Sequence, residues 1–104
     1  MTHNNFYKIN ARLVEFARAN SDKISSVWKG NDLEEEYLTY YFMQINNEYD
    51  SDLTDKITEL DIELSRQTNE TFSLSNSPPI KRKENPHLGK LIYASKAYIS
   101  NSHS

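Results

Sequence analysis

Seven carboxylates in the middle of the chain are the residues whose chemistry could define a site. They are Glu34, Glu35, Glu36, Glu48, Asp50, Asp52 and Asp55. Paired carboxylates can perform acid–base catalysis or hold Mg²⁺ or Ca²⁺. A calcium-binding loop that began at Asp50 would need glycine at its sixth position and glutamate at its twelfth, and the chain has Asp55 and Asp61 there. We therefore expect no catalytic residue, no metal site and no cofactor.

The composition removes several other kinds of chemistry. The 104 residues include no cysteine, which excludes disulfides, thiol nucleophiles and cysteine-based zinc sites. Two glycines are too few for the glycine-rich loops that cradle phosphates. The three histidines, His3, His87 and His103, show no spacing typical of metal ligands. No apolar run approaches the roughly 20 residues of a membrane span, and we expect a cytoplasmic protein.

The charge is distributed unevenly along the chain. Residues 32–70 carry twelve acidic and two basic side chains, a net charge of −10, whereas residues 1–31 carry +3 and residues 71–104 carry +4. Carboxylates in the first turn of a helix are stabilised by the helix dipole, which accounts for some of these acids. An excess of this size is also typical of a surface that faces a basic partner and speeds its encounter.

The acidic segment, residues 32–70, is also rich in tyrosine. Tyr37, Tyr40, Tyr41 and Tyr49 all lie within it. If residues 32–46 form one helix, these rings, together with Leu38 and Phe42, cannot all face a single core. Either the buried face is unusually wide, or some tyrosines lie on the surface, where they are efficient anchors for a protein partner.

Apolar residues recur at helical spacing through most of the chain. Leu53, Ile57, Leu60 and Leu64 form the clearest amphipathic pattern, and Asp50 or Ser51 can cap its start. Asn85-Pro86 resembles a helix start, and the segment that contains Pro78-Pro79 is predicted to be a loop, although Phe72 and Leu74 permit a short extended piece. The pattern predicts five helices, at about residues 5–20, 22–29, 32–46, 52–68 and 86–100.

These predictions define one all-α domain over residues 1–104. Its architecture would be a small irregular helical bundle, in which residues 69–85 form the loop before the last helix. Gly30 would end the second helix as a left-handed cap.

The acidic segment resembles part of a known class of proteins. A small acidic chain without cysteine, with Asp32-Leu33-Glu34-Glu35-Glu36-Tyr37-Leu38 opening a helix and Tyr40-Tyr41 in its middle, is similar to bacterial toxin-immunity proteins. The immunity proteins of nuclease colicins (bacteriocins) and of contact-dependent growth inhibition systems are the nearest in character. The resemblance covers about 20 residues and implies tight, one-to-one inhibition of a nuclease toxin.

The expected function is therefore that of an inhibitor that covers a basic protein. A nuclease site is basic because it holds phosphates, so an acidic protein can occupy it in their place. The predicted partner-binding residues are Glu34, Glu35, Tyr37, Tyr41, Glu48, Tyr49, Asp50 and Asp52. The alternative is a small regulatory or adaptor protein that contacts nucleic acid or another protein through the basic residues 81–83, although the overall acidic charge disfavours nucleic acid.

Overall fold

The computed structural model describes residues 3–30, 38–70, 72–77, 88–96 and 98. These residues form two helices and four strands, and the fold is α+β. The predicted all-α bundle of five helices is therefore wrong. In chain order the elements are α1 (His3–Ala19), β1 (Ile24–Gly30), β2 (Leu38–Gln44), α2 (Ser51–Thr68), β3 (Phe72–Ser77) and β4 (Leu88–Ala94).

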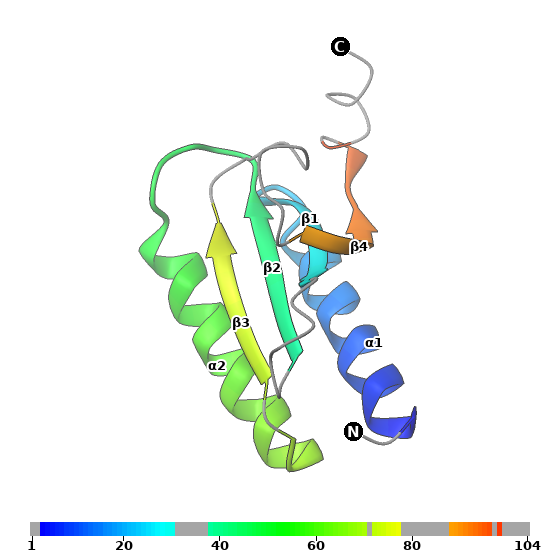
Figure 1. The fold of residues 1–104 in the computed structure, drawn as a ribbon. Coiled ribbons are helices and arrows are strands. Elements are labelled where there is room, and N and C mark those ends of the chain that lie inside the picture. The colour runs from blue at the N-terminus through cyan, green and yellow to red at the C-terminus, as the bar shows by residue number, and fades with distance from the viewer. Residues whose placement is uncertain (1–2, 31–37, 71, 78–87, 97, 99–104) are drawn as a thin grey trace.

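The four strands form one mixed sheet in the order β3-β2-β1-β4. The central strand β1 pairs antiparallel with both β2 and β4. Strands β2 and β3 are parallel, so the chain must cross between their ends, and α2 makes this crossing. In Figure 1 α2 runs beside β3, at one edge of the sheet, whereas α1 lies near β1 and β4.

The two long helices confirm the prediction for residues 5–20 and 52–68, with ends shifted by one or two residues. Each directs an apolar stripe into the same buried cluster, which also takes side chains from β1, β2 and β3. The helical members of this cluster are Ile9, Leu13, Phe16, Ala17, Leu53, Ile57, Leu60 and Leu64. One face of the sheet therefore carries the main core, and the polar faces of both helices point away from it.

The predicted helix at residues 22–29 is instead strand β1. Ile24, Val27 and Trp28 have helical spacing, but Ser25 is an extra residue opposite β2, which makes a β-bulge. The bulge allows Ile24 and Val27, three residues apart, to face the same core. Gly30 is not a helix cap but lies in the strand, where a Cβ would come within 3.1 Å of the Thr39 carbonyl oxygen.

The predicted helix at residues 32–46 is also wrong, because its second half is strand β2. Side chains along a strand alternate between the two faces. Tyr40 and Phe42 enter the main core, whereas Tyr41 and Met43 pack with Trp28 on the opposite face of the sheet. Aromatic residues suit a strand that is covered on both faces, which explains why this segment is rich in them.

The C-terminal part of the chain differs from its prediction in the same way. Strand β4 replaces the middle of the predicted helix at residues 86–100, and an irregular register against β1 lets Ile92 and Tyr93 both pack on the core. Strand β3 lies within the predicted loop at residues 69–85 and realises the extended piece that Phe72 and Leu74 permit. Within the described residues, no helix combines the length and apolar character needed to cross a bilayer.

Tyr40 joins the sheet to α1 through a partly buried hydrogen bond. Its hydroxyl donates to Oδ1 of Asn10 at 3.1 Å, while its ring is fully buried. Burial disfavours the phenolate and raises the pKa of Tyr40 from 10.0 to about 12. In the unfolded chain this tyrosine therefore loses its proton at a lower pH than in the folded one. The resulting contribution to stability is fully present below about pH 10 and is lost as the pH rises toward 12.

Tyr40→Phe is expected to lower the free energy of unfolding at pH 7 by about 1 kcal/mol, because it removes the hydrogen bond to Asn10. At pH 11 the difference from the original protein should shrink, because the variant has no phenol to ionise at this position. Urea unfolding at both pH values tests this. Tyr49→Phe, on a ring that is 78% exposed, is the control and should match the original protein at pH 7. A difference that is equal at both pH values would contradict the raised pKa.

Candidate functional site

The connection between β2 and α2 brings several of the predicted binding residues together. Strand β2 ends at Gln44, residues 45–50 form the connecting loop, and α2 begins at Ser51. Asp50 is the N-cap of α2, and its Oδ1 accepts a hydrogen bond from the Leu53 backbone N–H at 3.0 Å. This bond satisfies one of the donors that a helix start leaves unpaired, and of the two caps that the sequence allowed, Asp50 and Ser51, the structure uses Asp50.

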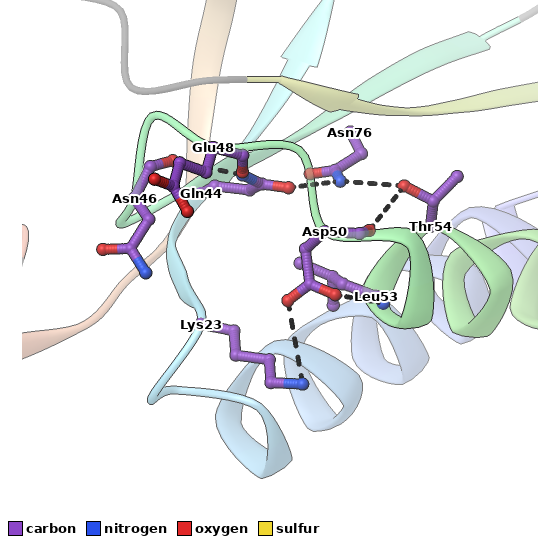
Figure 2. A network of polar contacts seen from close by, with 8 residues as sticks. All are labelled: Lys23, Gln44, Asn46, Glu48, Asp50, Leu53, Thr54 and Asn76. Atoms are coloured by element: carbon purple, nitrogen blue, oxygen red, sulfur yellow. Dashed lines mark hydrogen bonds and ion pairs between the residues drawn. The ribbon is translucent and has the colours of Figure 1, made fainter.

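A buried glutamine holds this loop in shape. The Gln44 side-chain amide donates from Nε2 to the backbone carbonyl oxygens of Asn46 and Glu48, at 3.1 and 2.7 Å. Gln44 is 5% exposed, so these bonds form largely out of water. Figure 2 shows the amide lying inside the loop, with its nitrogen toward the loop backbone. One side chain therefore sets the path of the backbone that carries Glu48 and Tyr49.

The same glutamine is anchored from the other side by β3 and α2. Nδ2 of Asn76, on β3, donates to Oε1 of Gln44 at 2.6 Å and to Oγ1 of Thr54 at 3.2 Å. The Thr54 hydroxyl in turn donates to the Asp50 backbone carbonyl at 2.9 Å. The network links two strands, the loop and the first turn of α2 (Figure 2). Each member restricts the others, which favours a single loop conformation.

The Asp50 carboxylate is held in its charged form. The hydrogen bond from the Leu53 N–H and the ammonium group of Lys23, 3.7 Å from Oδ2, both lower the pKa of Asp50 below its usual value. A carboxyl group with a lowered pKa is a poor proton donor near neutral pH. Its chemistry suits helix capping and ion pairing better than acid–base catalysis.

A small polar depression of about 240 Å³ lies beside the loop, with Lys23, Gln44, Asn46, Glu48, Tyr49, Asp50 and Ser51 around it. Its only basic side chain, Lys23, is paired with Asp50. Among the described residues, no group of three histidine or carboxylate side chains gathers closely enough to hold a metal ion.

The solvent-exposed side of α2 is the larger feature. Asp52, Asp55, Glu59 and Ile62 follow each other at intervals of three or four residues and are all exposed, so they form one stripe along the helix. We call this stripe, together with the exposed residues Glu48 and Tyr49 before the helix, the acidic face. Residues 48–70 contain eight acidic and two basic side chains, a net charge of −6.

The structure brings together only part of the predicted binding residues. Glu48, Tyr49, Asp50 and Asp52 are neighbours in the loop and first turn of α2. Tyr41 is separated from them, because it lies half-buried on β2 and packs with Trp28 and Met43. Three others, Glu34, Glu35 and Tyr37, lie outside the described residues, as does the basic segment 81–83 of the alternative hypothesis.

Two sets of residues were left out of the predicted binding residues, although Asp55 was among the carboxylates first considered. Asp55, Glu59 and Ile62 continue the acidic face, and their three-to-four spacing opposite the apolar stripe of α2 was a signal that could have identified them. No comparable signal existed for Gln44 and Asn76, which are 32 residues apart and meet only because β2 and β3 are paired.

Comparison with known proteins found no matching family model, no matching curated protein and no matching solved structure. The function must therefore be argued from the chain's own surface.

Gln44→Ala is expected to lower the free energy of unfolding by about 1–3 kcal/mol, because it leaves two loop carbonyls and the Asn76 amide without their partner. Denaturant unfolding measures the loss, and hydrogen exchange should show faster opening of residues 45–50. The matched control, Gln67→Ala at an exposed position of α2, should change stability by less than about 0.5 kcal/mol. Equal stability of the two variants would show that the network does not hold the loop.

Proposed function

We propose that this chain is a non-enzymatic binding protein that covers a basic surface of another protein with its acidic face. The observation that carries the proposal is the exposed stripe of Asp52, Asp55 and Glu59 on α2, which makes no ion pair among the described residues. Carboxylates without internal partners repel one another, and a positively charged partner relieves that repulsion.

The acids that the chain neutralises itself lie elsewhere. Nε of Arg12, on α1, is 2.9 Å from Oε2 of Glu63, and Lys23 pairs with Asp50. Lys56 and Arg66 are exposed on α2 and reduce the negative charge without cancelling it. Asp50 is therefore removed from the proposed contact set as a structural cap, and Asp55 and Glu59 are added to it.

Tyr49 supplies the aromatic anchor of the acidic face. Its side chain is 78% exposed, although a tyrosine of a folded domain usually buries most of its ring. The loop that carries it is tied down through Gln44, so a partner could bury the ring without first ordering the backbone. Ile62, which is 49% exposed, adds a second apolar contact further along α2.

The particular role we propose is neutralisation of a cognate nuclease toxin, one to one, in the cytoplasm. The physical support is that a nuclease must bind phosphates and therefore presents a basic cleft, into which an acidic helix and a tyrosine can fit. A chain without cysteine also needs no oxidising compartment to fold. The test begins with the reading frame next to this gene, which should encode a toxin-like C-terminal domain. Coexpression of the chain with that domain should restore growth, and a neighbouring frame without one would contradict this role.

The charge reversals Asp55→Lys and Glu59→Lys together are expected to slow association with that partner about ten- to hundredfold at low ionic strength, because they remove electrostatic steering. Stopped-flow fluorescence measures the association rate constant at low and high salt. The ratio of the rate constants of the original protein and the variant should become smaller at high salt, because salt screens the charges.

The control for this pair is Glu15→Lys with Asp22→Lys, which changes the net charge equally on the α1 side of the molecule. If both double variants slow association alike, the effect comes from net charge and the acidic face is not the contact. If instead the chain shifts labelled DNA or RNA in a gel, and Lys81→Ala with Arg82→Ala abolishes the shift, the nucleic-acid alternative replaces this proposal.

Tyr49→Ala should weaken the complex at least tenfold while leaving the free energy of unfolding within about 0.5 kcal/mol of the original, because the ring makes its contacts only with the partner. Calorimetric titration and urea unfolding of the same preparation measure the two effects. Tyr7→Ala, at the other highly exposed tyrosine, is the control and should bind normally. An unchanged affinity for Tyr49→Ala would remove this residue from the contact.

A further inference from the structure

A second surface lies between α1 and β4, away from α2. A groove of about 610 Å³ runs along the two elements. The α1 side is a stripe of residues three or four apart, Tyr7, Ala11, Val14 and Arg18, which differs from the stripe that enters the core. Tyr7 is 64% exposed. The groove is broad and open to solvent, and its lining is partly apolar.

The floor of the groove is formed by β4, which is an edge strand of the sheet. Strand β4 is the last strand in the order β3-β2-β1-β4, and only β1 pairs with it among the described residues. The outer edge of such a strand presents backbone N–H and C=O groups that a further strand can use. Leu91, in the middle of β4, lines the groove and is 37% exposed. Among the described residues, the groove therefore combines an unpaired strand edge with a partly apolar helix flank.

The charge of the groove is positive, in contrast to the acidic face. Arg18 and Lys90 line it, are exposed and make no ion pair among the described residues. The acid in the lining, Glu15, is 3.5 Å from Nη1 of Arg12, which Glu63 also contacts, so its charge is only partly offset and the two cations leave the lining with a net positive charge. A ligand that carries carboxylates would meet two cations here.

We propose that this groove binds an extended acidic peptide segment, which adds to β4 as a fifth strand. Its backbone would pair with the outer edge of β4. Because side chains alternate along a strand, one set would face α1, where Val14 and Arg18 lie on the same stripe, and the other would lie on the opposite face of the sheet with Leu91. In the set that faces α1, an apolar side chain would pack on Val14 and carboxylates would reach Arg18 and Lys90. This surface is separate from the acidic face, and the inference does not depend on the proposed function.

A second copy of this chain is a poorer occupant. Pairing two β4 strands about a two-fold axis would bring Lys90 and Arg18 of one copy toward the same residues of the other, and like charges in one interface are unfavourable. A single nucleic-acid strand would satisfy the cations but would leave the backbone edge of β4 unused. Both are alternatives that the experiment distinguishes.

The test is selection of a displayed library of random eight-residue peptides on the immobilised full-length protein. We expect enriched sequences in which the residues at every second position, the set that faces α1, are acidic or apolar. Binding of a synthesised peptide, followed by fluorescence anisotropy, should weaken at least tenfold with Arg18→Glu and Lys90→Glu together. It should be unchanged by Lys56→Glu with Arg66→Glu, which alters net charge equally on α2. The substituted positions are exposed, and circular dichroism confirms that each variant folds.

Two further measurements identify the mode of binding. The backbone amide resonances of residues 88–94 should shift on titration, and methylation of alternate peptide nitrogens should abolish binding because it removes the strand-pairing donors. The proposal is overturned if no sequence is enriched, or if the groove variant binds enriched peptides normally. Concentration-dependent dimerisation that the peptide reverses, or displacement of the peptide by single-stranded DNA or RNA, would assign the groove to the other occupants.

Discussion

Both helices must bury their apolar stripes on one face of a single sheet, and the remaining features of the molecule follow from this constraint. The stripe of α1 around Leu13 and that of α2 around Leu60 meet the inward residues of β1, β2 and β3 in one cluster. Burying a large apolar side chain stabilises the fold by about 1.5–3 kcal/mol, so this shared face outweighs any single surface contact. The polar sides of the helices are thereby directed outward, where α2 presents its acids and α1 faces the groove beside β4.

The buried amides of Gln44 and Asn76 complement this apolar core at one end of the sheet. A buried polar group is costly unless it is paired, and the nitrogen of each amide donates to partners that the core has already brought together. Oδ1 of Asn76 is buried without a partner among the described residues, so this amide is only half satisfied. The backbone of the connecting loop is therefore held in one conformation by hydrogen bonds, as the backbone of a strand is. A binding surface on such a loop loses little conformational entropy when a partner arrives, which is a physical reason to look for contacts at Tyr49.

The two proposed surfaces have opposite charge and lie on different elements. The α2 side is acidic, whereas α1 and β4 carry exposed bases such as Lys8, Arg18 and Lys90. A molecule polarised in this way orients a charged partner before contact and discourages the wrong face from docking. The same polarity explains why the net charge of −3 says little about either surface.

The sequence by itself determined α1, α2, a cap at Asp50 or Ser51 and the acidic character of the exposed side of α2. These features are local, because helical hydrogen bonds and stripes join residues three or four apart. Only the tertiary structure decided that Ile24, Tyr40 and Ile92 belong to strands, because a strand is stabilised by a partner distant in sequence. The bulge at Ser25 gave β1 a helical spacing of apolar residues. The separation of Tyr41 from Tyr49 and the pairing of Gln44 with Asn76 likewise depend on strand register, which no local pattern in this chain specifies.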